Sequence, residues 1–377
     1  MKKVAIVHDW LTGMRGGEKC LESICDVFPE ADIYTLIHIP GTVSKKIEKH
    51  KIITSFVQKF PGIQKYYRYY LPFFPKAVES FDLSAYEIVI SSSHCAAKGA
   101  IPGKGNLHVC YCHTPVRYVS DMSEQYFKRG KAGAVKHALL KPALDFIDRW
   151  DKRTTGRVSY FIANSMNVAR RIKTRYERDA VVIYPPVDID AFYSKREEDY
   201  YLIVSAFAPY KRVDIAIEAF NRLGKPLIVI GKGQDEKKLR KMAKPNIKFV
   251  GWVSDEKLAD FYSRCRSFIF PGEEDFGITP VEAQASGKPV IAYGKGGQLE
   301  TVKDINSCGK DNPTGIFFYS QDADSLIDAV RIFEEKRKLF NPVLIRENAE
   351  RFNRERFVKE FRRFVEEKIT EFKKEGY

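Results

Sequence analysis

The chain has 377 residues, 44% of them hydrophobic, and a formal net charge of +14. This length predicts two domains, each able to bury its own core, and the apolar content excludes a disordered chain. No apolar run reaches about 18 residues, so the pattern excludes a membrane-spanning helix. The opening stretch MKKVAIVHDWL is short and is interrupted by His8 and Asp9, so we expect a buried first strand there and no signal peptide.

Short β-branched runs alternate with amphipathic stretches along the chain, which predicts parallel sheets with helices on both faces. The expected strands are 3–9, 87–93, 107–113, 160–165, 180–185, 201–206, 226–231, 247–252, 267–272 and 289–294. The expected helices are 16–28, 211–224, 255–265, 322–337 and the charged stretch 353–377.

The alternation is interrupted near residue 185, where paired prolines and then charged residues predict a linker. We therefore expect an α/β protein with two Rossmann-like, doubly wound domains and a cleft between them. The expected boundaries are 1–185, 186–352 and a C-terminal helix, 353–377, that packs back on the first domain.

Charge and cysteine usage narrow the class of protein further. Most of the positive charge lies in residues 1–190, which favours an anionic partner: nucleic acid, an anionic membrane surface or a phosphorylated substrate. Seven scattered cysteines form neither a disulfide scaffold nor a zinc site, so we expect reduced thiols in a cytoplasmic protein.

Two loops of the first half follow expected strands, where parallel sheets bind ligands. Gly13, Gly16 and Gly17 form a loop that enters a helix and could bring backbone amides to a phosphate, or could simply make a tight turn. His113 stands where a strand becomes a loop and is a candidate site residue, although a single histidine can also be structural. Arg117 and Asp121 follow it and could pair with each other.

Two loops of the second half carry charge. Lys211 and Arg212 open a helix, where cations oppose the helix dipole unless an anion is bound; the alternative is that both point to solvent. In FPGEEDFGITPVEAQ, Thr279 as N-cap and Glu282 three residues later predict a capping box. Glu274 has no such structural explanation, and it stands beside Gly277 and a helix start.

A loop of this kind can bind a diphosphate through backbone amides while its carboxylates accept hydrogen bonds from sugar hydroxyls. The alternative is that the three successive acids 273–275 are a solvated surface. One acid before a helix and one inside it suit a ligand with hydroxyls on both sides of a diphosphate, and a nucleotide sugar has that layout.

The spacing of Glu274 and Glu282, together with MRGGEK, YCHTP, PYKR and PPVDIDAF in order, resembles the family 4 retaining glycosyltransferases of GT-B fold. The motifs in the first half of the chain most resemble those of bacterial mannosyltransferases of surface-polysaccharide assembly. The resemblance covers nearly the whole chain. It implies a hexosyltransferase without cofactor or metal, whose donor is GDP-mannose or a UDP-sugar and whose acceptor is a glycan or a lipid-linked glycan.

The resemblance also implies roles for single residues. Glu274 would hold the sugar hydroxyls, Glu282 the ribose, and Lys211 would neutralise the leaving diphosphate. His113 would lie by the transferred sugar. The remaining donor contacts would come from backbone amides or from the facing glycine loop, and they are Gly16, Gly17, Phe276, Gly277, Ile278 and Thr279.

One position departs from the family pattern: Ala206 stands where an arginine is usual, so Arg212 or another cation would supply that charge. Two other functions stay open. One is a GT-B-shaped epimerase or phosphorylase, and the other is a basic nucleic-acid-binding protein, although no nucleic-acid-binding module is recognisable and we expect no nucleic-acid partner.

The segment 59–77 alternates tyrosines and phenylalanines with basic residues. Such a composition is typical of a segment at a membrane interface, and it is equally compatible with aromatic packing inside the domain. The first alternative predicts peripheral binding to an anionic membrane.

Overall fold

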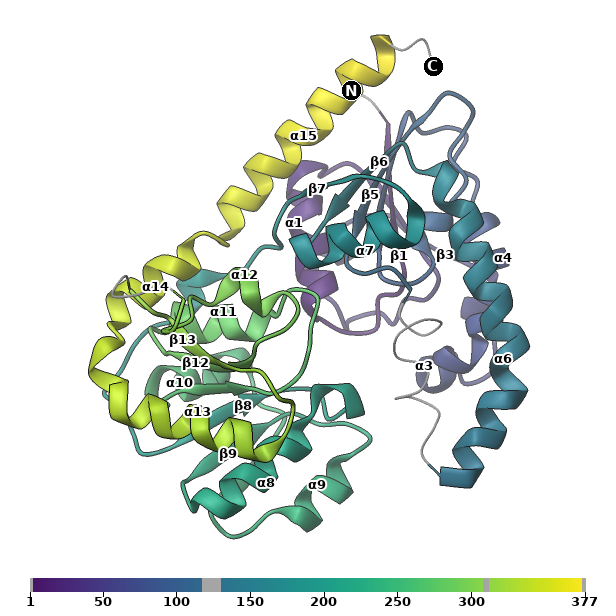
Figure 1. Ribbon diagram of the computed structural model, residues 1–377. Helices are drawn as coiled ribbons and strands as arrows, with labels where there is room; N and C mark the ends of the chain where they lie inside the picture. The colour runs from purple at the N-terminus through teal and green to yellow at the C-terminus, as the bar shows by residue number, and fades with distance from the viewer. Residues whose placement is uncertain (1–2, 117–129, 308–311, 375–377) are drawn as a thin grey trace. The chain divides into compact units, whose positions relative to one another are not determined.

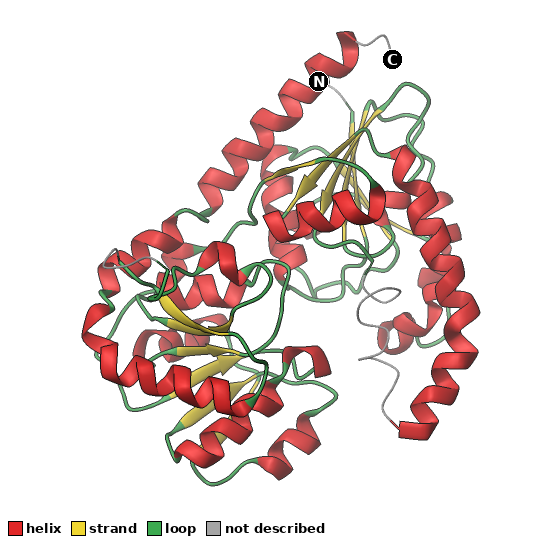
Figure 2. Ribbon diagram, viewed as in Figure 1, coloured by secondary structure: helices red, strands yellow, loops and turns green. Residues whose placement is uncertain are grey.

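The computed structural model describes residues 3–116, 130–307 and 312–374 (Figure 1). The chain divides into two compact units, one formed by Met1–Pro186 with Glu355–Tyr377 and the other by Val187–Arg354. Every strand pair in both units is parallel. In each unit, helices cover both faces of the sheet (Figure 2).

The first unit has a seven-stranded sheet with the order β3-β2-β1-β4-β5-β6-β7. Its strands are β1 (Val4–His8), β2 (Asp32–Thr35), β3 (Ile52–Thr54), β4 (Ile88–Ser93), β5 (Leu107–Cys112), β6 (Tyr160–Ala163) and β7 (Ala180–Val182). Its helices are α1 (Gly16–Val27), α2 (Lys45–Glu48), α3 (Ile63–Tyr66), α4 (Phe74–Glu79), α6 (Gly130–Arg153), α7 (Met166–Tyr176) and α15 (Arg354–Lys374). The 3₁₀ turns among its described residues are η1 (Phe56–Lys59), η2 (Tyr67–Phe73), η3 (Ala97–Gly99) and η4 (Thr154–Arg157).

The alternation of side chains along β1 divides the first core into two layers. Ile6 packs into one layer with residues of α1 and with Phe361 of α15. Val7 packs into the opposite layer with Trp10 and Phe74. The C-terminal helix is therefore part of the first core, although the whole second unit precedes it in the chain.

The second unit has a six-stranded sheet with the order β10-β9-β8-β11-β12-β13. Its strands are β8 (Tyr201–Val204), β9 (Leu227–Ile230), β10 (Ile247–Gly251), β11 (Phe268–Phe270), β12 (Val290–Tyr293) and β13 (Gly315–Phe318). Its helices are α8 (Val213–Leu223), α9 (Glu236–Met242), α10 (Asp255–Arg264), α11 (Ile278–Ala285), α12 (Gln298–Thr301), α13 (Ala323–Lys336) and α14 (Pro342–Glu350), with the 3₁₀ turns η5 (Ile189–Ala191), η6 (Pro209–Lys211) and η7 (Arg337–Leu339).

In both sheets the strand order reverses beside the first strand, between β1 and β4 and between β8 and β11. Connections on the two sides of such a point leave in opposite directions, and the crevice between them is where doubly wound sheets bind ligands. The fold therefore selects the loops that follow these four strands as the place to look for function.

The predicted α/β class is confirmed, and all ten expected strands are present. Three further strands, β2, β3 and β13, were not predicted. They have three or four residues each and lie toward sheet edges, so their apolar runs are too short to stand out from neighbouring loops.

His108 on β5 gives the first unit a measurable pH dependence. Its ring lies between Ser91 Oγ at 2.8 Å and the Arg157 carbonyl at 2.9 Å. Burial lowers the pKa of His108 from 6.5 to about 4. The unfolded chain therefore gains this proton near pH 6.5 while the folded chain does not, and stability is lost as the pH falls from there toward 4.

We predict that His108 alone lowers the free energy of unfolding by roughly 2 kcal/mol between pH 6.5 and pH 5. Urea unfolding of the wild type and of His108→Gln at both pH values measures this contribution as the difference between their pH slopes. Equal slopes would contradict it.

Candidate functional site

The loop between β11 and α11 carries the acids that the sequence analysis selected. Glu274 is half-buried and its backbone bridges to Gly296, whose φ is +86°. The Gly297 amide donates to the Glu274 carbonyl at 2.8 Å. A Cβ on Gly297 would lie 2.3 Å from the Asp275 carbonyl oxygen, so only glycine allows this close approach. The GKGG segment after β12 thus holds the acidic loop in place.

Lys211 and Glu274 come together as an ion pair, Nζ to Oε1, although they are 63 positions apart in the sequence. Lys211 ends η6, the turn that follows β8, and Glu274 follows β11. Their side chains are 15% and 23% exposed, so the pair is accessible from solvent. A Cβ on Gly272 would lie 3.0 Å from Lys211 Cα, which shows how closely the two loops pack. The carboxylate of Glu274, for which the sequence offered no structural explanation, therefore has Lys211 as a partner.

The helix α11 begins two residues earlier than expected. Its N-cap is Gly277, with a φ of +84°, so Ile278 and Thr279 lie in its first turn. The predicted capping box is therefore wrong, because Glu282 lies in the second turn instead of the third position after a Thr279 cap. Phe276 turns its ring into the core against Phe352, at 5.4 Å between centroids, which leaves its backbone as the part available at the loop.

Glu282 is buried, 5% exposed, and its Oε2 accepts a hydrogen bond from the Tyr262 hydroxyl at 3.1 Å. Burial, and then the charge of Glu282, raises the pKa of Tyr262 well above its ordinary value. Tyr262 therefore stays protonated and continues to donate. This bond fixes the position of the second acid of the pair.

Arg212 adopts a left-handed backbone, φ +50°, at the N-cap of α8. Its guanidinium donates to Asp214 at 3.3 Å and to Gln321 at 3.1 Å. Ala206, the position that departs from the family pattern, is exposed after β8. The structure thus places Arg212 next to Lys211 in sequence with its guanidinium held by other partners.

In the first unit, Gly16 and Gly17 begin α1 directly after the β1 loop. The Glu18 carboxylate accepts the Arg15 amide at 3.0 Å and so caps this helix. A Cβ on Gly17 would lie 3.7 Å from His8 Cε1, so the glycine loop lies over that histidine. The N-terminal amides of α1 therefore stand at the carboxyl end of β1.

His113 follows β5 and is half-buried. Its Nε2 lies 2.8 Å from Ser92 Oγ, and Ser92 Oγ lies 3.1 Å from His8 Nδ1. Burial, followed by the neighbouring His94 and His8, holds the pKa of His113 well below its usual range. His113 is therefore a neutral imidazole at neutral pH. Arg117 and Asp121, proposed beside it, lie outside the described residues.

Several polar residues of this edge were missed at the sequence level. The Asp9 carboxylate accepts four successive amides, from residues 94 to 97, at 2.5 to 2.9 Å. It also lies 3.1 Å from His94 Nδ1. The available signal was that VHDW and SSSH each place polar residues at the end of an apolar strand.

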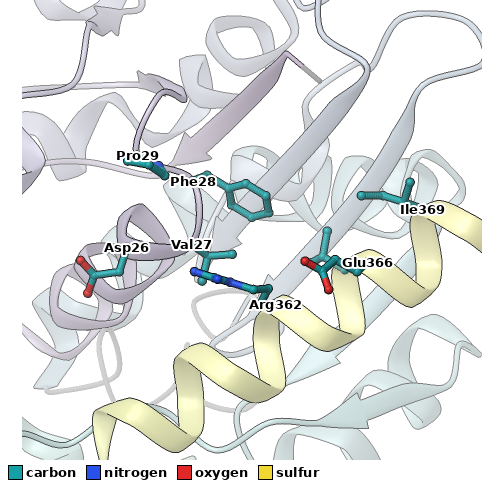
Figure 3. Close-up of a pocket in the computed structure, with 8 residues that line it drawn as sticks. Asp26, Val27, Phe28, Pro29, Arg362, Glu366 and Ile369 are labelled. Carbon is teal, nitrogen blue, oxygen red and sulfur yellow. The ribbon is translucent and has the colours of Figure 1, made fainter. Parts of the chain in front are cut away.

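A separate groove lies between the end of α1 and α15, where Phe28 faces Arg362 and Ile369 across it (Figure 3). It contains none of the site residues described above. We therefore assign it no part in the candidate site.

Comparison with known proteins gives the two halves of the chain separate family matches. The model of "Glycosyltransferase Family 4" matches residues 14–191, and that of "Glycosyl transferases group 1" matches residues 188–354. Together they extend over all the site residues.

Individual proteins agree with these matches. An uncharacterised glycosyltransferase of Methanocaldococcus jannaschii is 34% identical over 152 residues, 39% of this chain and 42% of that protein. The O-antigen chain mannosyltransferase C of Escherichia coli is 27% identical over 140 residues, 35% and 36% of the two chains. These matches thus span less than half of each relative. The Anabaena HepE structure with UDP and glucose superimposes with a TM-score of 0.69 at 18% identity, covering 97% of this chain and all of HepE.

The close packing at Gly297 yields a prediction. Gly297→Ala should lower the free energy of unfolding by roughly 1–3 kcal/mol, because the added methyl meets backbone atoms that must move. Gly156→Ala is the matched control, since a Cβ there meets nothing within 4 Å. Urea unfolding compares the two variants; equal stabilities would show that residues 296–297 do not hold the acidic loop.

Proposed function

The chain belongs to the family 4-type glycosyltransferases of GT-B fold, and from that premise we propose that it is a retaining hexosyltransferase. It takes a hexose from a nucleotide sugar and transfers it to a hydroxyl of a glycan or a lipid-linked glycan. The second unit holds the donor and the first unit receives the acceptor. Mannose from GDP-mannose is the donor that we favour.

The observation that carries this proposal is the ion pair of Lys211 with Glu274 at the strand-order reversal of the second unit. A diphosphate beside the amides of Gly277 and Ile278 would attract Lys211 away from the carboxylate. Glu274 would then be released to accept hydrogen bonds from sugar hydroxyls. One pair of side chains thereby serves both ends of the sugar–phosphate bond.

The chemistry then depends on the leaving group. As the glycosidic bond breaks, negative charge grows on the diphosphate, and Lys211 with the α11 amides stabilises it. The leaving phosphate itself takes the proton of the acceptor hydroxyl on the same face, so the anomeric configuration is kept. Glu282 binds the ribose. In the first unit, the amides of Gly16 and Gly17 suit a phosphate group and His113 suits a sugar hydroxyl.

The choice of sugar rests on the relatives. The Escherichia coli relative is named a mannosyltransferase, and HepE was solved with UDP and glucose. The first favours GDP-mannose and the second a UDP-sugar, and both are nucleoside diphosphate sugars. A screen of these donors therefore tests the proposal and identifies the sugar together.

We predict that one nucleotide sugar will stabilise the protein against thermal unfolding, by about 2.7 kcal/mol at a concentration of 100 times its Kd. With that donor, Glu274→Ala should lower kcat by roughly a hundredfold or more, because the sugar loses its carboxylate. Glu273→Ala is the control. Glu273 is the residue before Glu274, and its carboxylate pairs with Lys295 at 3.1 Å and is 40% exposed.

Equal activity of Glu274→Ala and Glu273→Ala would contradict the sugar-site assignment. NMR of the product should show the donor's anomeric configuration, and activity should persist in EDTA; an inverted product excludes the mechanism. An epimerase or phosphorylase would not release nucleoside diphosphate in an acceptor-dependent way. If the protein binds nucleic acid in a salt-sensitive way and binds no sugar donor, the alternative of a basic nucleic-acid-binding protein is favoured.

We further propose that the first unit contacts an anionic membrane through an aromatic patch, defined as Tyr66, Tyr69 and Phe73. These side chains are 46%, 81% and 47% exposed. Lys65, next to Tyr66, and Arg68, next to Tyr69, are also exposed. Aromatic rings flanked by cations suit the headgroup region of a bilayer. Within the described residues, no helix has the length and apolar content needed to cross one.

Other aromatic residues of 59–77 do not belong to this patch. Tyr67 is buried in the core, and the Tyr70 hydroxyl donates to the Pro61 carbonyl at 2.7 Å. Aromatic packing inside the domain therefore applies to part of the segment. Its buried face holds it to the first unit, and its exposed face is the candidate membrane contact.

We predict that serine at Tyr66, Tyr69 and Phe73 together will abolish most co-sedimentation with anionic phosphatidylglycerol vesicles, because the interfacial rings are lost. Salt should weaken wild-type binding, as surface electrostatics requires. Replacing Tyr193, Trp252 and Tyr319, exposed aromatics of the second unit, by serine is the control. Wild-type sedimentation of a folded patch variant would refute the contact.

A further inference from the structure

A chain of polar contacts runs beneath the surface of the first unit, from α1 to the loop after β5. The Glu18 carboxylate lies 3.9 Å from His8 Nε2, too far for a hydrogen bond but close enough for electrostatic attraction. His8 Nδ1 contacts Ser92 Oγ at 3.1 Å, and Ser92 Oγ contacts His113 Nε2 at 2.8 Å. His8 and Ser92 are both fully buried.

The direction of the hydrogen bonds follows from proton counting. Burial by itself raises the pKa of Glu18, but the neighbouring His8, with smaller effects from His94 and the backbone, outweighs it, and the pKa ends below its ordinary value. Glu18 is therefore an anion at neutral pH. A negative charge beside His8 Nε2 favours a ring proton on that nitrogen. When His8 carries a single ring proton, its Nδ1 is therefore a hydrogen-bond acceptor.

Ser92 has a single hydroxyl proton, so it can donate only one of its two hydrogen bonds. This decides which partner donates in the contact between Ser92 and His113. If His8 Nδ1 accepts, Ser92 donates to it, and the Ser92 oxygen must accept from His113. His113 is then protonated on Nε2. Since His113 is neutral, its Nδ1 must carry a lone pair, so it can accept a hydrogen bond but cannot donate one.

We propose that Glu18, His8 and Ser92 are positioning residues that fix His113 in the Nε2-protonated tautomer and present its Nδ1 as a hydrogen-bond acceptor for a ligand hydroxyl. The benefit of this tautomer to transfer rests on the proposed function, in which His113 suits a sugar hydroxyl. The tautomer itself is a property of the protein alone. The sequence motifs did not indicate this tautomer, because the four residues come from separate elements of the fold.

A further histidine flanks this chain of contacts without interrupting it. His94 lies beside it, with ring centroids 6.1 Å from His8 and 6.2 Å from His113, and is held by Asp9 and by the edge of Trp10. Burial, partly opposed by Asp9, lowers the pKa of His94. A neutral His94 adds no positive charge that would reverse the polarity of the chain.

Ring-¹⁵N NMR of the full-length protein, labelled at histidine and free of ligand, tests the proposal. His113→Gln assigns the His113 signals by their loss. In the wild type at neutral pH we expect one protonated and one unprotonated ring nitrogen, with the proton on Nε2. In Ser92→Ala the two nitrogen shifts should move toward each other, because both tautomers become populated.

Ser91→Ala is the matched control. Ser91 is the neighbouring buried serine on β4, and its hydroxyl contacts His108 at 2.8 Å instead of His113. This variant loses the same chemical group yet should leave the His113 shifts unchanged. Glu18→Gln provides a second route if Ser92→Ala fails to fold, since its amide oxygen can still cap α1 while its charge is gone. It too should move the His113 shifts toward averaging.

The proposal is overturned if wild-type His113 carries its proton on Nδ1, or if neither Ser92→Ala nor Glu18→Gln changes its shifts. Where transfer is measurable, Ser92→Ala should lower kcat by roughly tenfold, as loss of an orienting partner does for functional histidines, and Ser91→Ala should not. The wild type could show the expected tautomer yet transfer no sugar from any donor. That result would support the proposed chain of contacts and contradict the proposed function.

Discussion

In each unit, the constraint that organises the molecule is the reversal of strand order in a parallel sheet. On either side of the reversal the chain leaves the sheet in opposite directions, so the carboxyl ends of two adjacent strands are not covered by a crossover. In the first unit these strands are β1 and β4, and in the second they are β8 and β11. Residues that follow these two strands are far apart in the sequence, and the pairing of the strands alone makes them neighbours.

Each uncovered edge holds a carboxylate, and the two carboxylates have different kinds of partner. At the first edge, the buried charge of Asp9 is met by four backbone amides, which cannot move away. At the second, Glu274 is met by Lys211, a flexible side chain that can change partner. A carboxylate held by amides is suited to shaping a loop, whereas one held by a lysine is suited to exchange with an incoming anion.

The sequence was sufficient for features that depend on local pattern. Continuous apolar runs located the long central strands, and the position of Glu274 after one of them identified the acidic loop. The capping prediction failed because Gly277, with its positive φ, starts α11 before Thr279 can cap it. The pattern of a threonine followed three residues later by glutamate was present, but a left-handed glycine competes with it for the helix start.

Features that depend on strand order were beyond the sequence. His8 and Ser92 are 84 positions apart and meet only because β1 pairs with β4. Lys211 and Glu274 meet for the equivalent reason in the second unit. Each residue could be placed at the end of its own strand, yet nothing local states which strands are adjacent. The contacts that give these side chains their protonation and pairing therefore required the fold.

The path of α15 has a consequence for how the protein acquires its structure during synthesis. Four buried residues of α15 complete a core whose other buried members belong to the first 186 residues; they are Phe357, Phe361, Phe364 and Val365. The second unit is synthesised between these two parts of the core. Until α15 emerges from the ribosome, the apolar layer beneath it on the first unit stays uncovered. The second unit has no such dependence, because its residues are continuous in the chain. The order of translation and the order of completion therefore differ: the unit begun first is the one finished last.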